Sequence, residues 1–402
     1  MTAERTGSPH DAQRICRRAA GIAPAIARLD ATVKDAALLG MAGALEGASD
    51  RLVEANLQDL DRAREQEISP TVLDRLRLTD GRIAGMASGL RAVAALPDPV
   101  GEVLGGWKRP NGLLIEQVRA PLGVVAVIYE ARPNVTADVA GLCLKSGNAC
   151  VLRGSSVALS SNAAIVEVLR EAATANAVPP DAVQLVPGAD RASAVAVMQA
   201  RGLVDLLVPR GGSALIESIE KQATVPYIID GDGNCHVYVD RAAGSHMATE
   251  IVVNAKAQRP SVCNAAETLL VHTEIADKWL PAALDALANQ GVEVRGDDRV
   301  RQLWPGAVPA SEEDWATEYL DLILAVRVVD SLDEAISHIN RHGTSNAEAI
   351  VTQDLSAARR FASEVDSGSV FVNCSTRFSD GGEFGYGAEI GISTQKLHAR
   401  GP

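Results

Sequence analysis

The chain has 402 residues, a length that predicts two or three domains, and 47% of them are hydrophobic. Its 38 Lys and Arg against 51 Asp and Glu give a formal net charge of −13, and aromatic residues make up 3%. These values argue against a nucleic-acid-binding protein, which needs a basic face and aromatic stacking platforms, and against binding to an anionic membrane surface. A small anionic substrate is compatible with them, because a few local arginines can hold one inside an acidic protein.

The cysteines and the hydropathy predict a cytoplasmic protein. Six cysteines, none in a C-x-x-C pair, are too few for a disulfide scaffold and indicate a reducing compartment. No apolar run reaches the roughly 18 residues of a membrane span. Arg17-Arg18 before an alanine-rich stretch only weakly resembles a twin-arginine signal, so an amphipathic helix is the favoured interpretation.

The first half of the chain predicts a helical region followed by an α/β sheet. Residues 10 to about 96 carry apolar residues at spacings of three to four and are predicted to be almost entirely helical. β-Like patterns follow at 113–118 and 123–129. Short apolar strands then alternate with helices, as in a parallel sheet covered on both faces. The predicted strands are 149–153, 182–187 and 203–209, and the predicted helices are 135–146, 160–176, 190–201 and one that opens at Gly211.

A second α/β stretch shows the same alternation of predicted strands and helices. Its predicted strands lie near 235–239, 267–272, 321–329, 347–352 and 368–373. Its predicted helices lie near 245–257, 275–289, 331–342 and 354–365. Residues 374–402 are rich in Gly, Ser and Thr and are predicted to be loop with a little strand. The fold class predicted is therefore α/β, with two open α/β domains in series.

The familiar nucleotide-binding fingerprints are missing. Neither G-x-G-x-x-G after a strand nor G-x-x-x-x-G-K-[ST] occurs. The turns Arg153-Gly154-Ser155-Ser156 and Pro209-Arg210-Gly211-Gly212-Ser213 do lie between a strand and a helix, where phosphates bind free backbone N–H groups. Each turn alone is more often a plain connection.

No metal site is predicted. The run from Asp230 to Asn234 imitates a calcium loop, but Cys235 stands where the loop needs glycine and Arg241 where it needs glutamate. His338 and His342 have the i, i+4 spacing of a zinc pair but no evident third ligand, so a solvated helix face is predicted there.

Cys263 is the candidate nucleophile. Cys143, Cys150 and Cys235 fall within helix or strand patterns and are predicted to be core, whereas Cys263 lies in the polar run NAKAQRPSVCN. Nearby Lys256 and Arg259 could lower the pKa of the thiol, and the N-terminus of a following helix would also favour a thiolate. From composition alone, a nucleophile and a structural thiol stay equally open.

Five segments taken together carry a resemblance to a known family. They are PLGVVAVIYEARPNVTADVAGLCLKSGNACVLRGS (121–155), LLVPRGGSALI (206–216), GNCHVYVD (233–240), NAKAQRPSVCNAAETLLVH (254–272) and GAEIGISTQKLHARGP (387–402). The chain resembles the gamma-glutamyl phosphate reductases of the aldehyde dehydrogenase superfamily over essentially its whole length. The resemblance implies an NADP-binding domain of 1–100 and 121–230, a catalytic domain of 231–373, and an oligomerisation β-arm of 101–120 and 374–402.

The resemblance also implies roles for individual residues. Cys263 matches the nucleophile and Asn134 the asparagine that stabilises the oxyanion. The substrate's carboxylate and phosphate need cations, for which Arg132, Arg259 and Arg377 are candidates by sequence context. The positions that match cofactor-binding residues are Arg153, Ser155, Arg210, Gly211, Gly212, Ser213 and Glu318.

The activity implied is the NADPH-dependent reduction of L-glutamate 5-phosphate to L-glutamate 5-semialdehyde through a thioacyl-enzyme, in proline biosynthesis. The upstream glutamate kinase is an implied partner, and the chain is expected to be a homo-oligomer. Hydrolytic members of the superfamily have a glutamate base where this chain has Ile229, so water attack on the thioester is expected to be slow. An Asp230 side chain that pointed into the site would overturn this argument.

Three alternatives stay open. A member that acylates coenzyme A shares the cysteine and the fold, a hydrolytic member is disfavoured by Ile229, and a non-catalytic member would only bind the cofactor. The sequence leaves open NADPH against NADH, dimer against tetramer, and which arginine holds which end of the substrate. The family usually continues beyond the segment that ends at Pro402, which leaves open whether the dimer edge is complete here.

Overall fold

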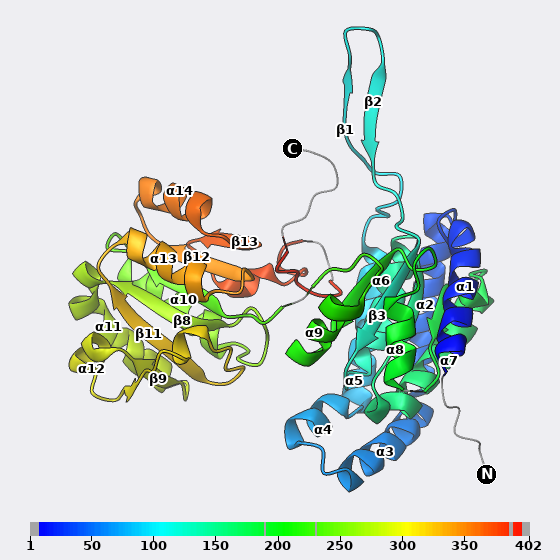
Figure 1. The fold of residues 1–402 in the computed structure, drawn as a ribbon, viewed down its shortest axis with the longest axis horizontal. Coiled ribbons are helices and arrows are strands. Elements are labelled where there is room, and N and C mark those ends of the chain that lie inside the picture. The colour runs from blue at the N-terminus through cyan, green and yellow to red at the C-terminus, as the bar shows by residue number, and fades with distance from the viewer. Residues whose placement is uncertain (1–7, 189, 230, 386–388, 396–402) are drawn as a thin grey trace. The chain divides into compact units, whose positions relative to one another are not determined.

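The computed structural model describes residues 8–188, 190–229, 231–385 and 389–395 (Figure 1). The chain divides into two compact units, which are Met1–Ile228 with Gly387–Gly391, and Ile229–Tyr386 with Ile392–Pro402. Each unit has its own parallel sheet, with helices and a hydrophobic core on both faces. The predicted fold class, two open α/β domains, is confirmed.

The first unit begins with five helices, which confirms the prediction that residues 10 to about 96 are almost entirely helical. Ser8 caps the first of them by accepting a hydrogen bond from the backbone N–H of Asp11, whose side chain binds back to Ser8. The helices are α1 (Pro9–Ile26), α2 (Ala31–Gly47), α3 (Ser49–Glu65), α4 (Pro70–Leu76) and α5 (Asp80–Ala95).

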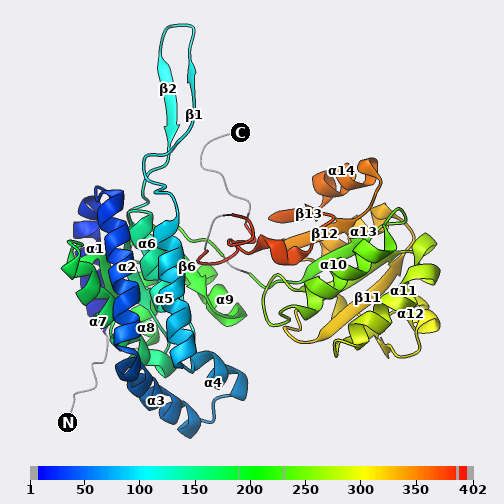
Figure 2. The same ribbon diagram turned by 180° about the vertical axis from the view of Figure 1, so that it is seen from behind.

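A four-stranded parallel sheet in the order β5-β4-β3-β6 forms the centre of this unit. All residues of its two inner strands are buried, because α1 and α8 cover one face while α2, α5, α6 and α7 cover the other (Figure 2). The strands are β3 (Val124–Tyr129), β4 (Ala149–Arg153), β5 (Val183–Leu185) and β6 (Leu206–Arg210). The helices are α6 (Asn134–Lys145), α7 (Leu159–Ala175), α8 (Arg191–Met198) and α9 (Ser213–Gln222), with short 3-10 turns at Ser156–Ala158 and Pro180–Ala182.

An antiparallel hairpin extends from the first unit (Figure 1). It pairs β1 (Val103–Lys108) with β2 (Leu114–Val118) and is joined to no other strand in the described residues. Six of its large apolar side chains are exposed, namely Val103, Leu104, Trp107, Leu113, Leu114 and Val118, whereas Ile115 is half-buried.

The second unit is built on a seven-stranded parallel sheet in the order β10-β9-β11-β8-β7-β12-β13. One face packs against α10, α11 and α12 and the other against α13 and α14. The strands are β7 (Cys235–Val239), β8 (Ala266–His272), β9 (Glu293–Gly296), β10 (Val308–Pro309), β11 (Ile323–Val329), β12 (Ala347–Val351) and β13 (Ser369–Val372). The helices are α10 (Ser245–Ala257), α11 (Thr273–Ala288), α12 (Asp298–Leu303), α13 (Leu332–His342) and α14 (Leu355–Glu364), with 3-10 turns at Asp314–Ala316 and Thr376–Ser379.

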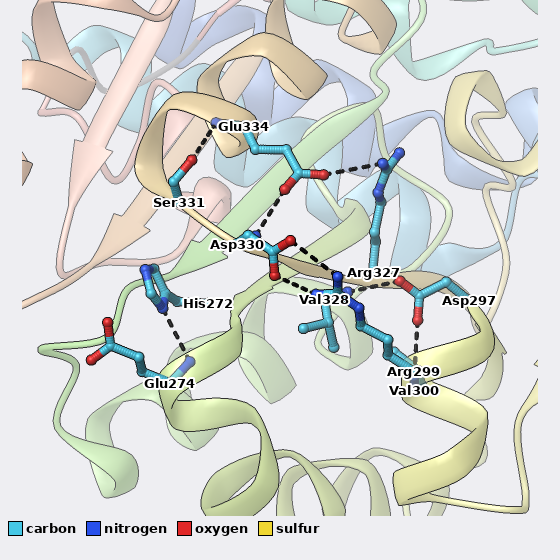
Figure 3. A network of polar contacts seen from close by, with 10 residues as sticks. All are labelled: His272, Glu274, Asp297, Arg299, Val300, Arg327, Val328, Asp330, Ser331 and Glu334. Atoms are coloured by element: carbon cyan, nitrogen blue, oxygen red, sulfur yellow. Dashed lines mark hydrogen bonds and ion pairs between the residues drawn. The ribbon is translucent and has the colours of Figure 1, made fainter.

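Polar side chains at the carboxyl edge of this sheet are used for capping (Figure 3). The Asp297 carboxylate accepts hydrogen bonds from the backbone N–H groups of Val300, at the start of α12, and Val328, in β11. Arg299, on α12, forms an ion pair with Asp330, which directly follows β11. These contacts satisfy helix-terminal and strand-terminal groups, so this edge of the sheet is structural. None of the helices in the described part of the chain has the length and apolar character to span a membrane.

Candidate functional site

Cys263 lies at the opposite, amino edge of the second sheet. Its loop joins α10 to β8, and Asn234 stands directly before β7, the neighbouring parallel strand. Cys263 is partly exposed, whereas Cys143, Cys150 and Cys235 are buried, as predicted. The strand predicted near 267–272 is confirmed as β8, so the segment that follows Cys263 does not supply the helix N-terminus that would favour a thiolate.

Gly233 packs directly against the Cys263 backbone. A side chain at Gly233 would overlap the Cys263 carbonyl, so only glycine allows this approach. The Gly233 N–H donates to the Glu318 carboxylate at 2.7 Å, and the Cys235 thiol donates to the Cys263 carbonyl at 3.3 Å. Gly233 therefore contacts both predicted residues, Cys263 by close packing and Glu318 by a hydrogen bond.

A buried ion pair ties together the two ends of the Cys263 loop. Lys256, near the end of α10, contacts Glu267, on β8, at 2.5 Å, and neither side chain is exposed. Burial raises the pKa of Glu267 and lowers the pKa of Lys256, and each charge partly offsets the shift of the other. In this structure Lys256 therefore pairs with Glu267. The sequence had suggested that Lys256 would stabilise the Cys263 thiolate.

A second polar cluster fixes the residue after the nucleophile. The buried Asn264 amide donates to Ser379 and to Asp380, both at 2.8 Å, and its carbonyl group accepts from Arg377. Arg377 also donates to Gln258 at 3.1 Å and to Asp380 at 2.6 Å. The segment after β13 thus clamps the Cys263 loop from the side.

The candidate substrate cations differ in their settings. Arg259 is exposed in the Cys263 loop, whereas the buried Arg377 guanidinium makes four hydrogen bonds to protein acceptors. Arg132 is half-buried in the first unit, just before α6.

The predicted solvated face at the histidine pair is wrong for His338. The His338 side chain is buried, with ring centroids 5.6 Å from both His236 and Trp315. Burial is the largest cause that lowers its pKa to about 2, so the ring is neutral. The Arg327 guanidinium contacts its Nδ1 at 3.3 Å. No group of three or more metal-ligating side chains occurs among the residues that the structure describes.

In the first unit, candidate residues gather at the carboxyl edge of the sheet. Asn134 opens α6 just after β3, while Arg153 and Arg210 end β4 and β6, the two neighbours of β3. The exposed Asn134 amide donates to Asp138 at 3.1 Å, and the buried Arg153 guanidinium donates to the Asp190 carbonyl at 2.9 Å. This is the edge at which open α/β sheets bind their ligands.

A cavity of about 1040 Å³ opens at the same edge. Gly154, Asn162 and Gly188 line it together with apolar side chains of the segment after β5 and with both apolar and charged residues of α7, among them Glu167 and Arg170. A side chain at Gly154 would overlap the Asn162 amide.

The residues around this cavity fit a nucleotide cofactor. Asn162 Nδ2 and Ser155 Oγ are buried and have no hydrogen-bond partner among the described residues. A dinucleotide offers ribose hydroxyl and phosphate oxygens to such groups. The cavity's size is in the range of cofactor pockets and its wall is largely apolar, as an adenine ring requires.

The glycine turn before α9 already holds an anion. The Glu130 carboxylate accepts a hydrogen bond from the Gly212 N–H at 3.2 Å, and a side chain at Gly211 would meet Glu130 at 2.7 Å. The start of α9 favours negative charge, as predicted for a phosphate, but a protein carboxylate is the anion there.

Several of these residues were missed from the sequence. Asp138 was detectable by its i, i+4 spacing from Asn134 on a predicted helix. Glu130, Asn162 and Asn264 gave no local signal, because their partners are distant in the chain.

Comparisons with known proteins identify the family of the chain. The aldehyde dehydrogenase family model matches residues 2–308 and 307–388. A gamma-glutamyl phosphate reductase from Thermobifida fusca is 56% identical over 99% of this chain and 95% of its own length. One from Moorella thermoacetica is 55% identical over 96% and 92%.

Solved structures show the same relationship. The gamma-glutamyl phosphate reductase of Thermotoga maritima is 45% identical and superposes with a TM-score of 0.91 over 98% of this chain and 95% of that chain. An acetylating aldehyde dehydrogenase from Geobacillus thermoglucosidasius, at 17% identity over 93% of this chain and 88% of that chain, shares the fold with a TM-score of 0.64. The chain is an oxidoreductase of the aldehyde dehydrogenase family and belongs to the gamma-glutamyl phosphate reductases within it.

Proposed function

We propose that this protein reduces L-glutamate 5-phosphate to L-glutamate 5-semialdehyde with NADPH and releases phosphate, as a step of proline biosynthesis in the cytoplasm. The observation that carries the proposal is the partly exposed Cys263, in a loop held at both ends by buried polar contacts. Such a loop suits a nucleophile, because a fixed thiol can be aimed at one carbonyl.

In this mechanism Cys263 attacks the acyl phosphate carbonyl. A new C–S bond forms, the C–O bond to phosphate breaks, and a thioester on Cys263 results. The side-chain amide of Asn134 and the backbone N–H of Cys263 donate hydrogen bonds to the oxyanion that forms during attack. The nicotinamide cofactor, which membership of the family implies, supplies the hydride when bound.

The surroundings of Ile229 support phosphate, and not water, as the acceptor in the reverse reaction. The Ile229 N–H donates to the Gln395 side chain at 3.0 Å, and its carbonyl accepts from the Thr394 N–H at 3.3 Å. An aliphatic side chain there cannot act as a general base. Asp230, the other candidate, lies outside the described residues.

For the cofactor, we propose that Arg153 and Ser155 bind the adenosine half. Arg153 would pair with a 2′-phosphate, which supports NADPH over NADH. The turn of Arg210, Gly211, Gly212 and Ser213 would bind the pyrophosphate once Glu130 moves aside, and Glu318 would bind the nicotinamide ribose. Glu318 has one carboxylate oxygen on the Gly233 N–H, which fixes its orientation.

For the substrate, Arg132 and Arg259 are the proposed cations for the carboxylate and the phosphate. Arg377 belongs to the same proposal, although its four hydrogen bonds to protein groups leave it less able to turn toward a ligand.

We propose one role for each of the predicted domains. Residues 1–100 and 121–230 would bind the cofactor and 231–373 would carry the nucleophile. Residues 101–120, with 374–402, would form a β-arm between subunits of a homo-oligomer. The exposed apolar hairpin supports this assembly, since exposed apolar surface of this kind marks an interface. Glutamate kinase, which would supply the unstable acyl phosphate, is the proposed functional partner.

The test is NADP⁺ reduction by glutamate 5-semialdehyde with and without inorganic phosphate, in the wild type and in Cys263→Ala. The proposal expects turnover that needs both phosphate and Cys263. Turnover without phosphate would identify a hydrolytic enzyme, and turnover restored by coenzyme A in place of phosphate would identify a coenzyme A-acylating one. Cofactor binding without turnover under any condition would identify a non-catalytic protein.

A further inference from the structure

Asp138 lies one helical turn beyond Asn134 on the same face of α6. Asn134 Nδ2 donates to Asp138 Oδ2 at 3.1 Å, the i, i+4 geometry that places two side chains in contact on a helix. Asn134 is exposed and Asp138 is half-buried. Asp138 therefore binds one N–H of the exposed Asn134 amide.

The protonation state of Asp138 decides which way the Asn134 amide points. An ionised carboxylate only accepts hydrogen bonds, so it must face the NH₂ group and not the carbonyl oxygen. One N–H is then bound by Asp138 and the second is left for another acceptor. A protonated Asp138 is itself a donor, and it would favour the reversed amide, with Oδ1 toward Asp138 and Nδ2 in the opposite position.

The charged groups around Asp138 place this change near neutral pH. Burial, the largest cause, raises the pKa of Asp138 to about 6, against the lowering effects of the Asn134 hydrogen bond and of Arg210 on β6. Glu389, from the segment that returns to this unit, raises it further. Gly89 of α5 packs next to the carboxyl group, and an added Cβ there would lie 3.8 Å from Asp138 Oδ1, an ordinary van der Waals distance.

We propose that Asp138 is a positioning residue for the reduction, whose ionised carboxylate fixes the Asn134 amide so that its second N–H donates to the oxyanion. The inference depends on the oxyanion role proposed above for Asn134. Asp138 itself touches neither substrate nor cofactor in this account. Arg210 assists by keeping the carboxylate ionised at neutral pH, and Glu389 opposes it.

The experiment measures kcat and KM from pH 5 to 8.5 for the semialdehyde-oxidising reaction with saturating phosphate. The variants are Asp138→Asn, Asp138→Leu and Asn134→Ala. Glu217→Gln is the control, because it removes one negative charge from an exposed position of the same unit. NADP⁺ affinity and circular dichroism establish that each variant is folded.

In the wild type, kcat is expected to fall as the pH drops through about 6. Asp138→Asn still accepts the Asn134 N–H through its own carbonyl but cannot titrate, so it should keep kcat within a few-fold at pH 7.5 and lose that part of the pH dependence. Asp138→Leu should lose kcat about tenfold at pH 7.5 with an unchanged KM for NADP⁺. Asn134→Ala should lose about 10²- to 10³-fold, as does removal of an oxyanion donor.

Two results separate this inference from the proposed function. If Asn134→Ala is severely impaired while both Asp138 variants keep the wild-type kcat and pH profile, the positioning role is wrong and the oxyanion role stands. If Asn134→Ala retains full activity, the oxyanion role fails and the inference with it. An acid limb with the same midpoint and depth in Asp138→Asn as in the wild type also overturns the inference, since the group that titrates there is then not Asp138.

Discussion

Lys256→Met should destabilise the second unit by leaving a buried carboxylate without its partner. Lys256 and Glu267 are both fully buried, so water cannot replace the lost ammonium group. Removal of one member of a buried ion pair typically costs about 3–5 kcal/mol of unfolding free energy. Met fills most of the Lys volume, so the cavity contribution is small.

The loss should depend on pH in a defined direction. Burial already raises the pKa of Glu267, and without Lys256 nothing nearby of opposite charge opposes that rise as strongly. A carboxyl group whose folded-state pKa is raised contributes stability at acid pH, and this contribution is lost as the pH rises through the folded-state value. The variant should therefore be least impaired near pH 6. Its deficit should grow by up to about 1.4 kcal/mol per pH unit between the wild-type pKa of Glu267, about 7, and the higher pKa of Glu267 in the variant, and should level off above the latter.

The assay is urea unfolding followed by tryptophan fluorescence at pH 6 and pH 8.5. Trp279, Trp304 and Trp315 belong to the second unit, and the remaining tryptophan, Trp107, is exposed on the hairpin. The double variant Lys256→Met with Glu267→Leu is the matched control, because it removes the uncompensated charge and should recover much of the loss. A deficit below about 1 kcal/mol, or one equal at both pH values, would refute the reasoning.

Three further changes test other parts of the account. Gly233→Ala should reduce kcat at least about 100-fold, because a Cβ there overlaps the Cys263 carbonyl. Gly382→Ala, which meets no atom within 4 Å, is the control, and equal activity of the two variants would contradict the packing argument. Glu130→Gln should tighten NADP⁺ binding several-fold in a fluorescence titration, since it removes a competing charge from the Gly212 N–H, and weaker binding would instead make Glu130 part of the site. Trp107→Ser with Leu114→Ser should shift the oligomer toward monomer in light scattering, because both side chains are exposed on the hairpin, and an unchanged mass would exclude the hairpin as an interface.

The sequence predicted those parts of the fold that local pattern determines. β4 has the predicted bounds, since ACVLR is a continuous apolar run between two helices with clear periodicity. β9, α12 and β10 were not predicted, because they are two to six residues long and carry Arg295, Arg299 and Arg301. β9 is stabilised by pairing with β11, β10 by pairing with β9, and α12 by the Asp297 cap, which are contacts that periodicity does not encode.

The candidate site was predictable only in part for the same reason. Cys263 stands out because a polar loop surrounds it, and the family resemblance then supplies its role. The partners that fix the loop come from far along the chain, as Asp380 does for Asn264. His338 was misjudged because Trp315 and Arg327, which bury it, lie outside its own helix. Long-range packing of this kind cannot be read from local spacing.

The central claim, a thioester on Cys263 that phosphate and not water removes, is tested most directly by a pre-steady-state measurement. Enzyme at high concentration is mixed with glutamate 5-semialdehyde and NADP⁺ in phosphate-free buffer, and NADPH absorbance is followed together with intact-protein mass. The account predicts a burst of about one NADPH per chain, an acyl adduct on the Cys263 peptide, and resumed turnover when phosphate is added. Steady turnover without phosphate, or a burst that survives in Cys263→Ala, would contradict it.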